Sequence, residues 1–338
     1  MGPLFSIGVT TYDRNDLLMD CINSILQQDF PDFEIIVGND FTQRQLSTDM
    51  LGISDPRIRI INYPTNLGPV GNANALIAAS QGRYFTLLAD DDLHSPCYLR
   101  AMAETLASHE MAKCIFCSYS TDIEAINNLA IRKGGASAKL KAYTGRQFLS
   151  LYLERAIATI GCYGVFDLKY LRDLGGLAQL GHGRSMYAEM PLVLASGLLE
   201  RVLYLDYPLV YFRPHPGSLS YTFTDVDACK SSQDELLGRC DVLFKKNQLC
   251  EDFHRNKFLI LNWCVQDFAT VMHRSGSIDK RYAIQYLRLM GVHLDSLKGS
   301  SYFVKTIFMI SRIFAAEMLL ALRGRLKRYR DCLREALN

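Results

Sequence analysis

Short apolar runs alternate with helix-patterned segments through the first third of the chain, and this alternation restricts the folds open to it more than any other feature. Between Leu17 and Leu26, apolar residues recur three and four positions apart, which is the spacing of one helix face. A repeated strand–helix–strand order predicts an α/β fold, in which helices flank a mostly parallel sheet. The apolar runs that have the length of strands are Phe5–Val9, Phe33–Gly38, Arg57–Asn62 and Tyr84–Ala89.

Two further helices are expected in this part of the chain. One covers residues 70–80 and ends before Gly82, and the other covers residues 96–108. Ser95 is a favourable N-cap for the second helix. Pro96 suits its first position, because the N–H that proline lacks would have no helical partner there.

The pattern changes in the second half of the chain. Apolar runs and polar segments are less regular there, and beyond about residue 224 only helices are predicted. We therefore expect an α/β region of residues 1–225, followed by a helical C-terminal region of residues 226–338.

The composition excludes several classes of protein. The 338 residues carry a formal net charge of +2, so nothing in the overall charge favours nucleic acid as a partner. No uncharged apolar run approaches the roughly 20 residues that span a bilayer, and the N-terminal segment does not have the pattern of a signal peptide. We therefore expect a cytoplasmic protein.

Polar clusters follow three of the predicted strands, at Thr10–Arg14, Asn39–Thr42 and Ala89–Asp92. The carboxyl ends of parallel strands lie at one edge of a sheet, and α/β proteins bind their ligands beyond that edge. We expect the three clusters to meet in space and to form the functional site.

The third cluster contains three consecutive aspartates, Asp90, Asp91 and Asp92. Grouped carboxylates are hard oxygen ligands suited to Mg²⁺ or Mn²⁺, and such an ion would remove their mutual repulsion. The alternative is a solvated acidic turn before a helix, where negative charge is also favourable. The aspartates by themselves leave both interpretations open.

Four segments, in order along roughly residues 5–220, resemble the motifs of family 2 glycosyltransferases. They are the strand–turn–helix–strand opening at 6–42, "NLGPVGNANALIAASQGRY", "LLADDDLHSP" and "YLDYPLVYFRPHPGSLS". The resemblance implies a fold of the GT-A type. Residues 1–100 would form its nucleotide-binding half and residues 101–225 its acceptor half.

Five residues match positions at which the family binds its nucleotide-sugar donor. Thr10 and Tyr12 would line the pocket of the nucleotide base, and Asp40 would accept a hydrogen bond from the base. Asn74 would lie near the ribose or the diphosphate, and Asp90 would face the ribose and the sugar.

The resemblance also implies a divalent cation, Mn²⁺ or Mg²⁺. Asp91 would be its main ligand, and Asp92 a further ligand or a neighbouring carboxylate. His215 would lie near the metal or the diphosphate. For Asp92 a local turn contact is the alternative, and for His215 a structural role.

Glu189, in "AEMPLVL", stands where the family places a carboxylate just before an apolar helix. One carboxylate must face the acceptor hydroxyl to take its proton, so Glu189 is the candidate general base. The alternative is an exposed acid in the first turn of a helix.

The resulting hypothesis is an inverting glycosyltransferase that moves a sugar from a nucleotide-diphosphate sugar to a hydroxyl of a glycan or lipid-linked glycan, in bacterial surface-glycan assembly. Trp263 is the only tryptophan, so the Gln-x-x-Arg-Trp motif of processive synthases is absent, and we expect a non-processive hexosyltransferase. The alternatives are a non-catalytic nucleotide-sugar-binding protein and a nucleotidyltransferase.

The C-terminal segment 301–334 has the pattern of a basic amphipathic helix, which can lie on a membrane surface at the inner face of the cell membrane. The alternative is that the apolar face of this helix packs on protein. The apolar stripe consists of Phe303, Ile307, Ile310, Phe314, Met318 and Leu322, and the basic residues that follow it are Arg323, Arg325, Lys327, Arg328 and Arg330.

Overall fold

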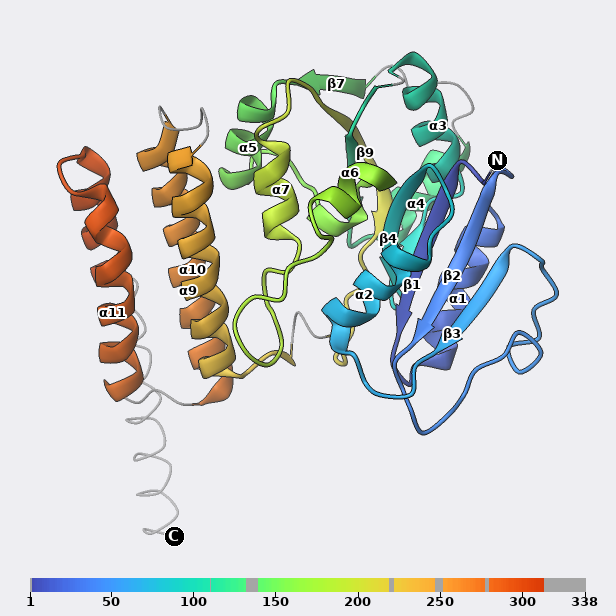
Figure 1. Ribbon diagram of the computed structural model, residues 1–338, viewed down its shortest axis with the longest axis horizontal. Coiled ribbons are helices and arrows are strands. Elements are labelled where there is room, and N and C mark those ends of the chain that lie inside the picture. The colour runs from blue at the N-terminus through green and yellow to red at the C-terminus, as the bar shows by residue number, and fades with distance from the viewer. Residues whose placement is uncertain are drawn as a thin grey trace, which may run out of the picture. The chain divides into compact units, whose positions relative to one another are not determined.

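The computed structural model describes residues 2–109, 111–131, 139–218, 222–246, 252–276 and 280–312 (Figure 1). The chain divides into two compact units. The first comprises Met1–Gln179 and Tyr187–Ser218, and the second comprises Leu180–Met186 and Leu219–Asn338. The division after Ser218 lies close to the expected boundary at residue 225. The assignment of residues 180–186 to the second unit has no counterpart in the sequence pattern.

The first unit contains a central mixed sheet. Over the described residues it has nine strands, in the order β3-β2-β1-β4-β8-β6-β9-β5, and β7 pairs with β9. The strands are β1 Phe5–Thr11, β2 Phe33–Asn39, β3 Ile58–Asn62, β4 Tyr84–Ala89, β5 Leu93–His94, β6 Cys114–Ser120, β7 Leu140–Tyr143, β8 Val165–Asp167 and β9 Val202–Tyr211.

The first four strands form the parallel part that the sequence predicts. β1 pairs with β2 and with β4, and β2 pairs with β3, all in parallel. β6 and β9 are also parallel, whereas β5, β7 and β8 join their neighbours antiparallel. The fold is therefore α/β as expected, with antiparallel pairings added by the second half of the sheet.

Helices cover both faces of the sheet. The buried faces of α1 and α3 pack on the face that carries Ile7, Ile35 and Leu88, in one continuous apolar core. On the opposite face, a Cβ at Gly8 would lie 3.3 Å from Leu76 of α2, so the helix approaches the strand closely there. The helices are α1 Asn15–Leu26, α2 Gly68–Ala79, α3 Tyr98–Ser108, α4 Ile123–Ile131, α5 Gly145–Leu153, α6 Leu168–Asp173 and α7 Met190–Ser196, with a 3₁₀ turn, η2, at Gly161–Tyr163.

The start of α3 differs from the expectation. The helix begins at Tyr98 and not at Pro96, and Cys97, not Ser95, is the N-cap. The side chain of Gln28, two residues after α1, takes over the capping. Its Oε1 accepts the N–H of Leu99 at 2.9 Å, and its Nε2 donates to the carbonyl of Ser95 at 2.7 Å. Gln28, which is distant in sequence, therefore caps the helix in place of Ser95.

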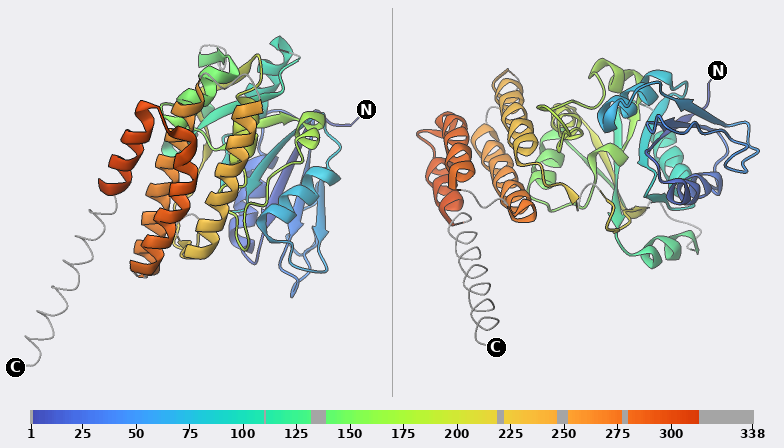
Figure 2. Two further views of the ribbon diagram at one scale, coloured as in Figure 1. Left: turned by 60° about the vertical axis from the view of Figure 1, so that its left-hand side comes forward. Right: turned by 90° about the horizontal axis from the view of Figure 1, so that it is seen from below.

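Apart from the segment 180–186, the described residues of the second unit are mainly helical, as the sequence predicts (Figure 2). A buried polar contact ties two of its helices, because the Tyr286 hydroxyl donates to Gln233 Oε1 at 2.7 Å. The segment 180–186 packs on the same unit, where the N–H of Gly181 donates to Glu235 at 2.7 Å. The helices are α9 Val226–Lys246, α10 Phe253–Ser275 and α11 Lys280–Leu294, and residues 301–312 are also helical.

Candidate active site

Three strand ends meet, as the polar clusters predict. The N–H of Asp40, just after β2, donates to the carbonyl of Thr11 at 3.1 Å, and the N–H of Asp90, just after β4, donates to the carbonyl of Thr10 at 3.2 Å. β1 lies between β2 and β4, so the end of β1 holds both acidic residues. Residues from three segments of the sequence are thus brought to one edge of the sheet.

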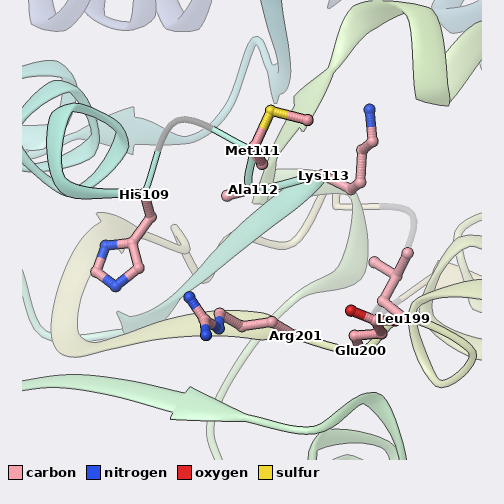
Figure 3. A pocket seen from close by; sticks show the side chains of 7 residues that line it. All are labelled: His109, Met111, Ala112, Lys113, Leu199, Glu200 and Arg201. Carbon is pink, nitrogen blue, oxygen red and sulfur yellow. The ribbon is translucent and has the colours of Figure 1, made fainter.

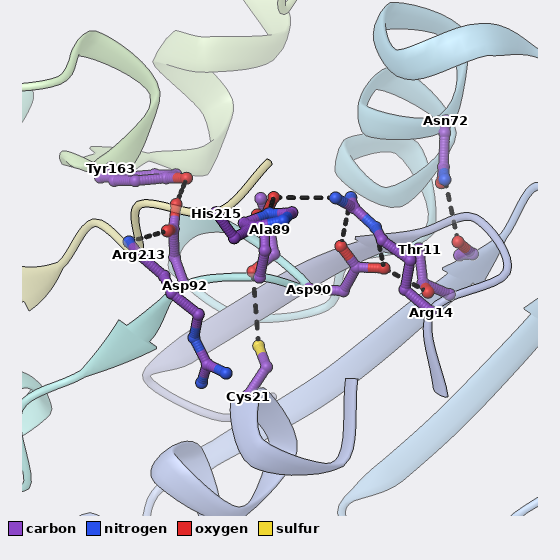
Figure 4. Close-up of polar contacts among 12 residues, drawn as sticks. Thr11, Arg14, Cys21, Asn72, Ala89, Asp90, Asp92, Tyr163, Arg213 and His215 are labelled. Carbon is purple, nitrogen blue, oxygen red and sulfur yellow. Dashed lines mark hydrogen bonds and ion pairs between the residues drawn. The ribbon is translucent and has the colours of Figure 1, made fainter. Parts of the chain in front are cut away.

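Asp90 is buried against the end of β1 (Figure 4). Its carboxylate accepts a hydrogen bond from the Thr11 hydroxyl at 2.6 Å and pairs with the Arg14 guanidinium at 2.5 Å. Burial raises the pKa of Asp90 to about 6, because the charged form loses hydration. Arg14 and Thr11 oppose that shift in pKa, and Asp91 adds to it.

Asp91 lies between two basic side chains. Its Oδ2 is 2.8 Å from Nη1 of Arg14 and 2.9 Å from Nε2 of His215, which belongs to the segment after β9. His215 is 124 positions from Asp91, and the structure brings the two side chains together.

Asp92 faces a different set of partners (Figure 4). The Tyr163 hydroxyl donates to its Oδ2, and the backbone N–H of Arg213 donates to its Oδ1 at 2.8 Å. Burial raises the pKa of Asp92 to about 7, with a further contribution from the charge of Asp91. Since both carboxylate oxygens have protein partners, these contacts suit a residue that ties β9 and η2 to the site better than a metal ligand.

Glu189 lies at the N-cap of α7, and its side chain packs on η2. A Cβ at Gly161 would be 2.9 Å from the Cγ of Glu189, so only glycine leaves room there. The carboxylates of Glu189 and Asp92 both raise the pKa of the Cys162 thiol, after burial, so this thiol lies in the field of both acids. Burial also raises the pKa of Glu189 itself.

Aromatic and charged side chains surround the turn after β1. The half-exposed ring of Tyr12 meets Phe41 edge-on, with 5.3 Å between the ring centroids, and the Arg44 guanidinium lies 5.7 Å from the Phe41 ring. Asp40 is buried nearby and accepts the N–H of Leu67 at 2.6 Å. The turn therefore exposes an aromatic ring, whereas the carboxylate of Asp40 is buried.

Asn74 has other partners than those the sequence suggested. Its Nδ2 donates to the carbonyl of Leu177 at 2.9 Å, and its Oδ1 accepts the N–H of the same residue at 2.9 Å. Gly176 has a φ of +70°, and a Cβ there would lie 2.3 Å from Asn74 Oδ1. The amide therefore secures the turn after α6 to α2, and we leave Asn74 out of the donor-binding set.

Sequence reasoning assigned no role to four residues of this site: Thr11, Arg14, Tyr163 and Arg213. The first two belong to the polar cluster after β1, which was a signal for them. Tyr163 lies 71 positions from Asp92 in a segment with no distinguishing pattern, and Arg213 contributes a backbone N–H, which no side-chain motif reveals.

The donor set can be compared with what a divalent cation requires. Among the described residues, no group of three or more His, Cys, Asp and Glu side chains has the arrangement of a metal site. Asp91 and His215 are adjacent, however, and Mg²⁺-type sites use one or two protein carboxylates together with phosphate oxygens of the substrate. The two side chains fit a cation that a diphosphate helps to hold.

One described pocket lies elsewhere in the first unit (Figure 3). Its volume is about 730 Å³, and it is lined by His109, Lys113, Glu200 and Arg201 among others. Lys113 and Arg201 precede β6 and β9, so the pocket is at the strand ends opposite to those that carry the aspartates. It contains none of the predicted site residues.

Comparison with known proteins points to one family. Residues 6–164 match the model of glycosyl transferase family 2. The succinoglycan biosynthesis protein ExoO of Rhizobium meliloti is 35% identical over 102 residues, which are 30% of this chain and 29% of that protein. The GalNAc(5)-diNAcBac-PP-undecaprenol beta-1,3-glucosyltransferase of Campylobacter jejuni is 37% identical over 93 residues, which are 27% of this chain and 30% of the relative. The chain thus spans about a third of the length of these curated relatives.

A solved structure has the same fold over nearly the whole chain. S. aureus TarS 1-349, crystallised in complex with UDP-GlcNAc, superposes with a TM-score of 0.66 at 14% identity and covers 96% of this chain and 92% of its own. At this identity the likeness establishes the fold alone.

Proposed function

We propose, from the premise that residues 6–164 belong to glycosyl transferase family 2, that the chain transfers a sugar from a nucleotide-diphosphate sugar to a hydroxyl acceptor with inversion of configuration. The observation that carries the proposal is the group formed by Asp90, Asp91 and His215 at the joined ends of β1 and β4. The family match and this group occur in the same unit of the chain.

On the donor side, Tyr12 and Asp40 bind the nucleotide base, Thr10 lies beside them, and Asp90 faces the ribose and the sugar. The exposed ring of Tyr12 can stack on a base, and a carboxylate such as Asp40 can accept an imide N–H. Asp91 and His215 would hold Mn²⁺ or Mg²⁺, which when bound neutralises charge that develops on the diphosphate leaving group.

On the acceptor side, Glu189 takes the proton of the attacking hydroxyl. Burial raises its pKa above the ordinary value of a carboxyl group, which makes its carboxylate a stronger base. The hydroxyl then attacks the anomeric carbon on the face opposite to the departing diphosphate. Orientation of the two substrates and charge stabilisation supply most of the rate enhancement.

The acceptor is a glycan or a lipid-linked glycan of a bacterial surface, to which the enzyme adds hexose units without processive polymerisation. The names of ExoO and of the undecaprenol-linked glucosyltransferase support this assignment. No helix in the described ranges combines the length and the apolar character that crossing a bilayer requires. We place the enzyme at the inner face of the membrane, with contact through residues 301–334.

The described helix at 301–312 supports membrane contact by fewer exposed apolar residues than the sequence pattern suggested. In the helix at 301–312, Ile310 is buried and Ile307 is exposed, so these two residues of the expected stripe do not share one exposed face. Val304 and Phe308 are exposed beside Ile307. Phe314, Met318, Leu322 and the basic residues lie outside the described residues.

A panel of nucleotide sugars tests the proposal. The protein is incubated with each donor and Mn²⁺, and release of nucleoside diphosphate is measured with and without candidate acceptors. We expect one donor to be consumed, and Asp91→Asn and Glu189→Gln each to reduce that consumption. Metal-dependent donor binding with neither transfer nor hydrolysis would instead identify a binding protein.

A further inference from the structure

An arginine contacts the carboxylate that is proposed as the main ligand of the cation. Nη1 of Arg14 is 2.8 Å from Asp91 Oδ2, Nη2 is 2.5 Å from Asp90 Oδ1, and Nε is 3.3 Å from Asp90 Oδ2. One guanidinium thus bridges two neighbouring carboxylates. Figure 4 shows its contacts with Asp90. Such planar, charge-assisted contacts are among the strongest hydrogen bonds in proteins.

The backbone turn before α1 leads directly to this arginine. Asp13 has a φ of +53°, a left-handed conformation that is unusual for a residue with a side chain. Its carboxylate pairs with Arg44 at 2.7 Å, and Arg14 then serves as the N-cap residue of α1. The side chain of Arg14 therefore extends from a fixed backbone position.

The contact with Asp91 is the one that matters for metal binding. Asp91 Oδ2 is already approached by Arg14 and by His215, so a cation that used this oxygen would meet two protein partners. A divalent ion on Asp91 would also be repelled by the guanidinium at close range. An ion on Asp91 and the Asp91–Arg14 contact would therefore compete.

We propose that Arg14 is an exchangeable counter-ion: it neutralises Asp90 and Asp91 in the free protein, and it competes with a divalent cation for Asp91. The identity of the competing ion rests on the proposed function. The consequence is that the free protein holds the cation weakly, although its carboxylates are well placed to bind it.

Mn²⁺ alone is the probe, and its binding to the full chain is measured by electron paramagnetic resonance of the unbound ion. Arg14→Met removes the guanidinium and keeps a side chain of similar reach. We expect this variant to bind Mn²⁺ about tenfold more tightly or better, because a unit charge within a few ångströms of the ion has been removed. A merely structural arginine gives the opposite result, because its loss would loosen the site.

The matched control is Arg57→Met, which removes the same charge from a surface ion pair with Asp55. We expect it to leave Mn²⁺ affinity unchanged. In Arg14→Met combined with Asp91→Asn, the gain in affinity should disappear, which locates the ion at Asp91.

A pair of variants covers the case in which Arg14→Met does not fold because Asp90 is left buried and charged. Asp90→Asn removes that charge, and the comparison is then between Asp90→Asn and the double variant with Arg14→Met. The double variant should bind Mn²⁺ more tightly than Asp90→Asn.

Equal or weaker Mn²⁺ binding after removal of Arg14, or no binding in any variant, overturns the proposal. No sugar donor is present, so the result is readable whether or not the protein transfers sugar. Tighter Mn²⁺ binding without any transfer activity would reject the proposed function and retain the role of Arg14.

Discussion

Three adjacent aspartates have three different environments, and each environment follows from its partners. Asp90 is buried beside Thr11 and Arg14, Asp91 contacts Arg14 and His215, and Asp92 is engaged by Tyr163 and the Arg213 backbone. A turn in the backbone directs consecutive side chains to different neighbours. Of the three, Asp91 has the side chain with the greatest exposure, which suits it to an incoming ion.

Asp91→Asn should reduce metal-dependent turnover by about 10²-fold or more, because stabilisation of the leaving diphosphate by a bound ion contributes several kcal/mol. The measurement is nucleoside diphosphate release with Mn²⁺, accompanied by thermal unfolding to verify the fold. Asp29→Asn, which breaks an exposed pair with Arg100, is the control and should retain full turnover. Normal turnover in Asp91→Asn would contradict the assignment of the metal ligand.

Glu189→Gln should retain donor affinity and lower kcat by about 10² to 10⁴, the usual contribution of a general base. The base must be deprotonated, so activity is lost as the pH falls through the pKa of Glu189. Burial raises that pKa above its ordinary value, and the acid limb of the kcat profile should lie correspondingly high. The residual activity of Glu189→Gln should show no acid limb in its kcat–pH profile. An acid limb at the same pH in the variant would exclude Glu189 as the general base.

At the scale of elements, side-chain contacts between segments distant in sequence set the positions of helices. Gln28, just after α1, caps α3. Asn74 of α2 secures the turn that follows α6, and Glu189 at the start of α7 packs on η2. Gln28 and Asn74 form hydrogen bonds with backbone groups of other segments. Glu189 fills the space beside Gly161, which has no side chain.

Asn74→Ala should destabilise the protein by roughly 1–3 kcal/mol, since it leaves the N–H and the carbonyl of Leu177 without their partner. Donor affinity should change little if the role of Asn74 is structural. Urea unfolding and donor titration measure the two effects, with Asn23→Ala at an exposed position of α1 as the control. A large loss of donor affinity at unchanged stability would restore Asn74 to the nucleotide site.

A buried charge joins α9 and α10 in the second unit. Nζ of Lys257 is fully buried and lies 2.6 Å from Asp241, which is partly exposed. Asp241→Asn leaves the buried ammonium without its counter-ion and should lower the free energy of unfolding by about 3–5 kcal/mol. Lys257→Met leaves only a carboxylate that water can reach and should lower it by about 1 kcal/mol. Urea unfolding should reveal this asymmetry, and equal losses would show that the ammonium is hydrated.

At the scale of the molecule, the two units differ in their kind of core. The first is built on a sheet with helices on both faces, and the second on helices that pack on one another and on the short segment 180–186. The proposed chemistry belongs wholly to the first unit. Membrane contact is proposed for the end of the second.

Liposome flotation tests that contact. Thr306 and Ile310 are buried, so truncation after Arg312 retains the described helix and removes the basic segment. The full chain should float with anionic vesicles at low salt and be released at high salt, since each basic residue contributes about 1 kcal/mol near the surface. The truncated chain should remain unbound. Equal flotation of both chains would exclude the removed segment as the membrane contact.

Local pattern in the sequence determined the α/β class and the helical C-terminal region, because the periodicity of strands and helices is set by near neighbours. The repeated strand–helix–strand order also indicated the meeting of the three polar clusters, because such connections make successive strands parallel. Only the tertiary structure decided which polar groups pair. It placed Arg14 across Asp90 and Asp91, engaged Asp92 with Tyr163, and turned Asn74 toward Leu177. These pairings join segments up to about a hundred positions apart. They depend on distances and on the loss of hydration, and neither quantity is encoded in the spacing of residues along the chain.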